Sequence, residues 1–145
     1  YSAKANVLGV QVQQMLAGGQ EVIIGAVTDP VFGKLVAFGL GGVLVEVLKD
    51  ITFRLAPATE DDALSMLDGI AAAQILKGVR GADPVNRAAL ATMIQNVSQL
   101  IADHPEIAEM DLNPVKVLAR GVRVVDARVR IERRPVLPPS RRIAY

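Results

Sequence analysis

The chain has 145 residues and a formal net charge of +1, and 51% of its residues are hydrophobic while only 3% are aromatic. This charge argues against a nucleic-acid partner, which usually requires a strongly basic face and stacking aromatic residues. The absence of cysteine excludes disulfides and thiolate metal sites, and no uncharged apolar run approaches the ~20 residues of a membrane helix. We therefore expect one cytoplasmic domain with neither a membrane nor a nucleic-acid partner.

The first part of the chain is predicted to be an antiparallel meander of strands. β-branched and aliphatic residues dominate short runs that glycine and proline turns separate. The expected strands cover residues 7–15, 21–28, 34–38, 43–48 and 51–55. Turns are expected at Gly18 and Gly19 and at residues 29–33, where Asp, Pro and Gly favour a tight reversal.

A first helix is predicted to begin after Thr59. The Thr59 hydroxyl is suited to an N-cap, and the acidic residues at 60–62 lie near the positive end of the helix dipole. We expect this helix to end before Gly69 or, with a bend, near Gly78.

A second helix is predicted over residues 84–102. Asp83 is the expected cap and Pro84 the first helical residue. The apolar residues recur at helical spacing, which predicts that one face packs on the sheet. They are Leu90, Ile94, Val97 and Ile101, with Met93 and Leu100 beside them. His104 precedes a proline and is expected to cap the helix rather than to perform chemistry.

The last part of the chain predicts a β-hairpin with a defined register. Pairing about a tight loop at Ala119 and Arg120 places Asn113 opposite Asp126. The same register pairs Glu109 with Arg130, Met110 with Val129, Asp111 with Arg128, Leu112 with Ala127 and Pro114 with Val125. One face is then polar and the other apolar, and a slip of one residue would exchange them.

Asn113 and Asp126 are candidate metal ligands in this hairpin. Opposed side chains have Cβ atoms about 4.5–5.5 Å apart, so an amide oxygen and a carboxylate can bind one cation. Mg²⁺ prefers oxygen ligands and often takes only one or two protein groups besides waters and phosphates. The alternative is a polar cross-strand pair beside two ion pairs. Asp111 is a further candidate ligand, although its expected partner Arg128 favours an orienting role.

Several segments, in a fixed order, resemble the ATP-grasp domain of the NDP-forming acyl-CoA synthetases, which are relatives of the nucleotide-binding subunit of succinyl-CoA synthetase. The segments are residues 9–15, 21–25, 29–33, 39–43, 45–50, 53–57, 78–81 and 109–114. Each segment is weak evidence alone, but their order is specific. The resemblance extends over about residues 8–131.

The resemblance implies an α+β fold, in which a mostly antiparallel sheet is covered by two or more helices. Residues 1–131 would form the second lobe of the ATP-grasp domain, and residues 132–145 an Arg- and Pro-rich linker or tail. The implied site residues are Gln13, Gln14 and Met15 at the adenine, Glu21 at the ribose, and Asn113 and Asp126 at Mg²⁺. Glu21 has a competing interpretation as a solvent-facing residue at the start of a strand. Gly41 and Gly42 are candidates for a close approach to a phosphate or for a simple turn, and Glu46 and Arg54 are weaker candidates nearby.

The implied activity is the ATP-dependent joining of a carboxylic acid to coenzyme A, with release of ADP, through an acyl phosphate and a phosphohistidine. The implied partners are ATP with Mg²⁺, the remaining lobe, and the domains that carry coenzyme A and the phosphohistidine, in an enzyme expected to be oligomeric. We identify no phosphate-covering glycine loop, coenzyme A domain or carrier histidine in the chain. No catalytic residue is therefore assigned, and the chain alone is expected to be inactive.

Two other functions stay open at this point. One is a noncatalytic nucleotide-binding or subunit-docking module, and the other is a different carboxylate ligase with the same fold. Because the first residue is Tyr1 rather than methionine, we expect the chain to be part of a longer protein. Pro138, Pro139, Ser140, Arg141 and Arg142 resemble the junction to an acetyltransferase in fused members of the family.

Overall fold

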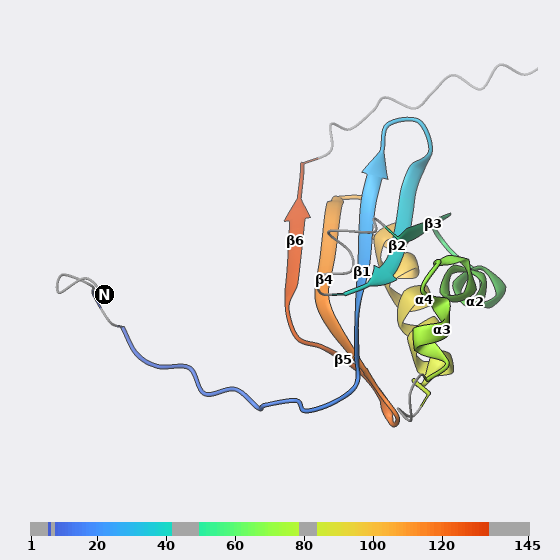
Figure 1. Cartoon of the computed structure of the whole chain (residues 1–145). Coiled ribbons are helices and arrows are strands. Elements are labelled where there is room, and N and C mark those ends of the chain that lie inside the picture. The colour runs from blue at the N-terminus through green and yellow to red at the C-terminus, as the bar shows by residue number, and fades with distance from the viewer. Residues whose placement is uncertain (1–5, 7, 42–49, 79–83, 134–145) are drawn as a thin grey trace, which may run out of the picture.

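The computed structural model describes residues 6, 8–41, 50–78 and 84–133. These residues form an antiparallel six-stranded sheet with three helices, which confirms the α+β class (Figure 1). The strands are β1 (Gln20–Asp29), β2 (Gly33–Leu40), β3 (Ile51–Leu55), β4 (Ile107–Leu118), β5 (Gly121–Val124) and β6 (Ala127–Ile131). The helices are α2 (Glu60–Gly69), α3 (Ala73–Leu76) and α4 (Arg87–Asp103).

The sheet has the order β3-β2-β1-β4-β5, and β6 also pairs with β4. The predicted meander is confirmed for β1, β2 and β3. The turn between β1 and β2 forms because the Asp29 carboxylate accepts hydrogen bonds from the backbone N–H groups of Val31 and Phe32, at 2.7 and 2.8 Å. Gly33 closes this turn with a φ of 81°, a conformation that favours glycine.

The predicted register of the last hairpin is confirmed. Glu109 pairs with Arg130 and Asp111 with Arg128. Leu118 pairs with Gly121, so the loop consists of Ala119 and Arg120 as predicted. Between β5 and β6 the pairing continues, because the Asn113 N–H donates to the Asp126 carbonyl at 3.1 Å. The short turn leaves the two segments little freedom to slip.

A β-bulge in β4 changes which of its side chains face the core. On β1, Val22 pairs with Val115 and Ile24 with Leu112, so an extra residue of β4 is accommodated between these two pairs. Within residues 109–112, before the bulge, the buried positions are Met110 and Leu112, and after it they are Val115 and Val117. The predicted alternation is therefore correct up to Leu112 and reverses beyond it.

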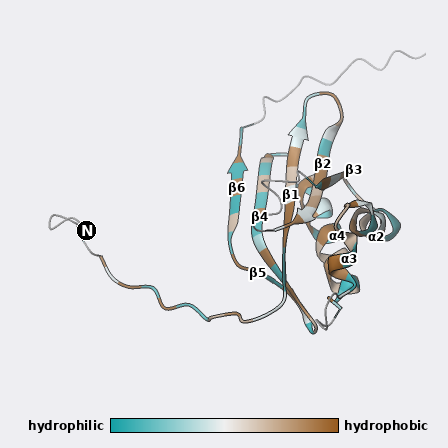
Figure 2. Ribbon diagram, viewed as in Figure 1, coloured by the Kyte–Doolittle hydropathy of each residue, from teal (hydrophilic) through white to brown (hydrophobic). Residues whose placement is uncertain are grey.

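The helices cover one face of the sheet. α4 packs against β1, β2 and β5, and α2 packs against β2, β3 and α4. The largest fully buried side chains between these layers include Phe38, Ile24, Met66, Leu90 and Ile94. The predicted apolar stripe of α4 is confirmed, since Leu90, Ile94, Val97 and Ile101 are all buried. Figure 2 shows that much of β1 is apolar, whereas β6, which pairs with β4, alternates between hydrophobic residues and arginines.

The first helix begins as predicted. Thr59 caps α2 by accepting a hydrogen bond from the Asp62 N–H at 3.1 Å, and the Asp62 carboxylate accepts one from the Thr59 N–H at 3.0 Å. This reciprocal arrangement is a capping box. α2 ends at Gly69, and the short α3 follows.

The second helix begins three residues later than predicted, at Arg87. Its cap is Asn86, whose side-chain oxygen accepts a hydrogen bond from the Ala89 N–H at 2.9 Å. The predicted cap, Asp83, lies outside the described residues. The helix ends as expected, because the His104 N–H donates to the Leu100 carbonyl at 3.0 Å.

The predicted strand at residues 7–15 is wrong for its described part. Residues 8–17 have no regular secondary structure, and Figure 1 shows the segment running away from the sheet. Leu8, Val10 and Val12 are each more than 90% exposed. A β-rich sequence forms a strand only where a neighbour accepts its hydrogen bonds, and within the described residues this segment has no such neighbour.

Two further predictions fall outside the described residues. These are the extended segment at 43–48 and, from residue 134 onward, the predicted tail. Among the helices of the described ranges, none combines the length and the apolar character that crossing a membrane would require.

Candidate functional site

The sheet face opposite the helices, here called the open face, carries the predicted polar residues. On β1 and β4, the buried residues point toward the helices. The residues that precede and follow them in the same strand point to the opposite face of the sheet. Residues that pair across strands share a face. The open face therefore carries Glu21, Glu109, Asp111, Asn113, Lys116, Arg123, Asp126, Arg128 and Arg130.

A pocket of about 550 Å³ lies at one end of this row. Its lining residues are Gln13, Gln14, Met15, Leu16, Glu21, Lys116, Arg123, Val124 and Val125. The pocket unites the four residues predicted to contact a nucleoside, although they belong to two different segments. Its volume lies within the range of about 300–1,000 Å³ that is usual for small-molecule sites.

Lys116 is the pocket residue that the sequence reasoning missed. Its Nζ donates hydrogen bonds to the carbonyl oxygens of Leu16 at 3.0 Å and Gly18 at 3.2 Å, and it lies 3.6 Å from the Glu21 carboxylate. The pairing of Glu21 with Lys116 depends on the β1–β4 register, and the β4 bulge places Lys116 on the open face. The sequence did contain one indication of its position: Lys116 lies between Val115 and Val117 in a strand pattern, so its side chain points to the face opposite theirs.

Asn113 and Asp126 are neighbours on the open face, beside the pocket. Both residues are exposed. One Asp126 carboxylate oxygen accepts a hydrogen bond from the Ala127 N–H at 2.9 Å, and the other has no hydrogen bond to any described residue. The pair thus offers an amide oxygen and a carboxylate oxygen in a position open to solvent.

These two oxygens fit Mg²⁺ but do not enclose it. Within the described ranges, no group of three or more His, Cys, Asp or Glu residues is arranged to hold a metal ion. A cation at Asn113 and Asp126 would need waters or phosphate oxygens for its remaining positions. That is the usual way in which Mg²⁺ binds at nucleotide sites.

Beyond this pair lies a second, smaller pocket of about 260 Å³, lined by Glu109, Asp111, Arg128, Val129 and Arg130. The predicted ion pair of Glu109 with Arg130 is confirmed, with 3.2 Å between the carboxylate and Nε. Arg130 also contacts Glu132. The predicted ion pair of Asp111 with Arg128 is not formed. Their backbones pair, but the exposed Arg128 side chain makes no hydrogen bond or ion pair with the described residues.

Gly41 packs closely against the backbone of Glu21. Its N–H donates to the Glu21 carbonyl at 2.8 Å, and a Cβ on Gly41 would lie 2.9 Å from the Glu21 carbonyl carbon. Glycine is therefore required for this close approach to β1. The other residues proposed around it, Gly42 and Glu46, lie outside the described residues.

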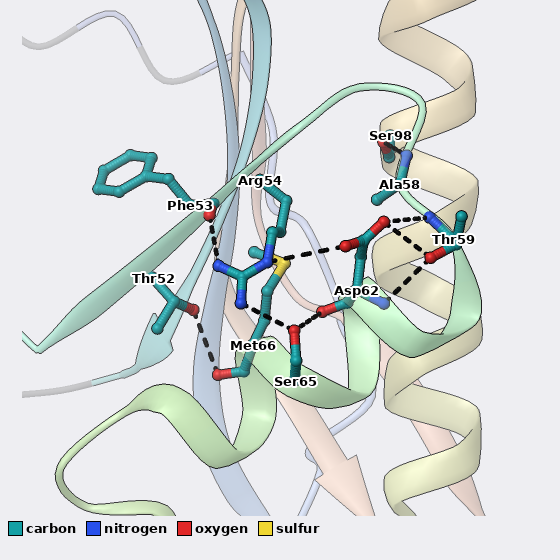
Figure 3. A network of polar contacts seen from close by, with 9 residues as sticks. All are labelled: Thr52, Phe53, Arg54, Ala58, Thr59, Asp62, Ser65, Met66 and Ser98. Carbon is teal, nitrogen blue, oxygen red and sulfur yellow. Dashed lines mark hydrogen bonds and ion pairs between the residues drawn. The ribbon is translucent and has the colours of Figure 1, made fainter.

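Arg54 points toward the helices and not into the pocket around Glu21. Figure 3 shows its guanidinium beside Ser65 and Asp62 of α2, with an Nη2 to Ser65 Oγ distance of 2.8 Å. In the same view the buried Ser98 accepts a hydrogen bond from the Ala58 N–H at 2.7 Å. Arg54 therefore joins β3 to α2, which is a structural role.

Two carboxyl groups have lowered pKa values, and both lie at helix ends. Hydrogen bonds from the Thr59 backbone and hydroxyl lower the pKa of Asp62, and the nearby Arg54 adds to this effect. A hydrogen bond from its own backbone N–H and one from His104 lower the pKa of Glu106. His104 Nδ1 lies 3.0 Å from the Glu106 carboxylate.

Residues 1–131 match the ATP-grasp domain family. The chain is 51% identical over 126 residues to "Acetate--CoA ligase [ADP-forming] I" of Archaeoglobus fulgidus, covering 87% of this chain and 18% of that protein. It is 48% identical over 129 residues to the beta subunit of "Acetate--CoA ligase [ADP-forming] I" of Pyrococcus furiosus, covering 89% of this chain and 56% of the subunit.

Among solved structures, it resembles the dinucleotide-forming acetyl-coenzyme A synthetase 1 of Ca. Korarchaeum cryptofilum in complex with coenzyme A and Mg-AMPPCP. The TM-score is 0.78 at 44% identity, and the match covers 81% of this chain and 55% of that one. The chain therefore spans about a fifth of the Archaeoglobus ligase and about half of the Pyrococcus beta subunit.

Proposed function

Because the chain belongs to the ATP-grasp domain family of the ADP-forming acetyl-CoA ligases, we propose that it is the second lobe of the nucleotide site in an acid–CoA ligase that forms ADP. The observation that carries this proposal is the arrangement of the open face. The pocket that contains Glu21, the pair Asn113 and Asp126, and the second pocket follow one another along β4. This order matches the nucleoside, the phosphates and the reacting end of a bound nucleotide.

The nucleoside end has two proposed contacts. The peptide groups of Gln13, Gln14 and Met15 read the edge of the adenine, since this segment has no strand partner among the described residues and its backbone groups remain open for a ligand. The Glu21 carboxylate accepts hydrogen bonds from the ribose hydroxyls. Such bonds to a charged acceptor are stronger than neutral ones.

At the phosphate end, Asn113 and Asp126 hold Mg²⁺ together with the phosphate oxygens. When bound, the ion neutralises the negative charge that develops as the terminal phosphoryl group leaves. The hydrogen bond from the Ala127 N–H orients the Asp126 carboxylate. The residues of this lobe thus position the nucleotide and form no covalent bond to it.

The remaining chemistry belongs to other domains in this proposal. In the Korarchaeum synthetase, coenzyme A is bound and a phosphohistidine segment points towards the nucleotide-binding site. By analogy, an acyl phosphate and a phosphohistidine link the nucleotide site of the complete enzyme to coenzyme A. The other half of the ATP-grasp domain covers the phosphates, and the lobe alone has no activity. The partners are then these domains and further subunits of a cytoplasmic ligase.

The test uses a complete ligase that contains this lobe, with Asp126→Asn and Asn113→Ala as variants. We expect each variant to weaken Mg²⁺-dependent ATP binding by at least about tenfold, because a loss of one charged hydrogen-bonding or ligand group costs about 1.5–3 kcal/mol, and to abolish ADP release. Asp61→Asn is the matched control, since Asp61 is exposed on α2 away from the open face. Unchanged turnover in the two variants would eliminate the metal assignment.

The same assay separates the alternative functions. Binding of MgATP without ADP release in the unmodified ligase would favour a noncatalytic module. ADP release without consumption of coenzyme A would favour another carboxylate ligase with this fold.

A further inference from the structure

The side chain of Lys116 connects the segment before β1 with Glu21 of β1 in the proposed nucleoside pocket. The Lys116 ammonium has three N–H donors. Two of them are directed to the carbonyls of Leu16 and Gly18, and the Glu21 carboxylate lies 3.6 Å away. All three neighbours belong to the protein, so the ammonium has little capacity left for a ligand.

The burial of Lys116 supports a fixed position. Its side chain is 18% exposed, against 42% for Glu21, so the cation is held between the segment before β1 and the sheet. Within the described ranges, no other side chain forms a hydrogen bond with residues 8–18. Among the side chains of the described residues, Lys116 is therefore the one that holds Leu16 and Gly18 at the pocket.

We propose that Lys116 is a positioning residue that holds the segment of Leu16 and Gly18 in register with the Glu21 carboxylate, and so sets the distance between the base and ribose subsites. This inference rests on the proposed function, because it concerns the nucleoside end of the same site. Lys116 acts through the protein groups that contact the nucleotide. It does not bind the phosphates.

Arg123 offers a comparison within the same pocket. It pairs with Lys116 across β4 and β5 and also lines the pocket. Its Nη1, however, donates to the carbonyl of its neighbour Val122 at 3.0 Å and not to the segment at 16–18. Removal of Arg123 therefore changes the charge of the pocket without releasing that segment.

The first measurement is limited proteolysis by thermolysin at the Met15–Leu16 bond without nucleotide, in the complete ligase. Lys116→Met is expected to speed this cleavage, because the hydrogen bonds that hold the carbonyls of Leu16 and Gly18 are lost, while Arg123→Met and the remote Lys77→Met leave it unchanged. Lys77 is exposed at the end of α3 and pairs with Asp68. Equal cleavage rates in Lys116→Met and the unmodified ligase would overturn the inference, whatever the enzyme binds.

The second measurement separates positioning from phosphate binding. Lys116→Met is expected to raise KM for ATP about 10- to 100-fold, the loss expected for charged hydrogen bonds, with kcat changed less than about twofold because ground state and transition state are affected equally. Inhibition by magnesium tripolyphosphate, which lacks base and ribose, should stay unchanged, and Lys116→Arg should restore part of the loss. Lys77→Met should behave as the unmodified ligase.

The outcomes distinguish a failure of this inference from a failure of the proposed function. If Lys116→Met weakens tripolyphosphate as much as ATP, Lys116 is a phosphate ligand and the positioning role is wrong. If the unmodified ligase neither binds MgATP nor releases ADP, the proposed function itself fails. Should Lys116→Met not fold, Lys116→Gln removes the charge while keeping polarity and is subjected to the same two measurements.

Discussion

At the scale of single residues, the open face combines groups whose neighbours determine what they can do. Glu21 lies at the start of β1 and is partly exposed, so its carboxylate can reach both Lys116 and a ligand in the pocket. Within the described residues, Asn113 and Asp126 have no acidic cluster around them that would hold a metal ion without a nucleotide. In the proposed function, the cation would therefore bind together with the nucleotide and not before it.

Glu21→Gln tests the ribose contact in the complete ligase. The substitution keeps the shape of the side chain but removes its charge, so KM for ATP is expected to rise about tenfold, in keeping with the greater strength of charged hydrogen bonds. For 2′-deoxy-ATP the rise should be much smaller, because that substrate lacks one of the hydroxyls. Comparison of the two substrates in both proteins gives a double-mutant cycle, and equal rises for both would contradict the assignment of Glu21 to the ribose.

At the scale of elements, the bulge in β4 is the feature that assembles the site. It lets β4 bury Met110 and Leu112 on one side of the bulge and Val115 and Val117 on the other. As a result, Asn113 and Lys116 both face the open side although they lie three positions apart in the chain. An unbroken alternation would have placed residues 113 and 116 on opposite faces.

Gly41→Ala tests the contact between the end of β2 and the start of β1. A Cβ at this position would lie 2.9 Å from the Glu21 carbonyl carbon, and backbone atoms cannot move aside as a flexible side chain can. The free energy of unfolding is expected to fall by about 1–3 kcal/mol, the range for overpacked sites, as measured by urea denaturation.

Gly9→Ala is the control for this substitution. A Cβ on Gly9 would meet no atom within 4 Å, so stability should be unchanged within about 0.5 kcal/mol. A Gly41→Ala protein as stable as this control would show that β1 and β2 can separate at this point without cost.

At the scale of the whole molecule, the helices cover one face of the sheet, and the residues of the proposed nucleotide site lie on the other. The network of Arg54, Asp62, Ser65 and Thr59 joins β3 to α2 on the covered side (Figure 3). The open face has no such cover within the described residues. Changes in the capping network should therefore affect stability and leave nucleotide affinity unchanged.

The pH dependence of unfolding follows from this division. The pKa of Asp62 in the folded protein is below its ordinary value of 3.8, and that of Glu106 is below 4.5. A depressed carboxyl pKa adds stability that is fully present above the unfolded value and is lost as the pH falls through the folded one. Stability should thus be flat with respect to these groups above about pH 5 and decline below about pH 4.

Asp62→Asn checks the assignment by urea denaturation across this range. The variant should be less stable at neutral pH and should lose less stability on acidification, because one of the depressed groups is gone. Asp61→Asn, a neighbour in the same helix turn, should keep the original pH profile. An identical acid response in both variants would exclude Asp62 as a source of the effect.

Much of the local structure was predictable from the sequence because it depends on neighbours in the chain. The cap at Thr59, the turn after Asp29, the apolar stripe of α4 and the register of the last hairpin all arise within short segments. The position of Asn113 opposite Asp126 was predictable for the same reason, since the two-residue loop at Ala119 and Arg120 determines which residues of the two segments pair. The roles of these side chains at a nucleotide stay predictions.

Only the tertiary structure decided the rest, because it depends on segments that are distant in the chain. The pairing of β1 with β4 brings Glu21 to Lys116, and the bulge that turns Lys116 outward is visible only against β1. The start of α4 is a local exception: the helix begins at Arg87 and not at residue 84 because the side chain of Asn86 caps it. Residues 8–17 show the opposite limit: their alternating pattern has the period of a strand, but a strand needs a partner, and the described fold provides none for them.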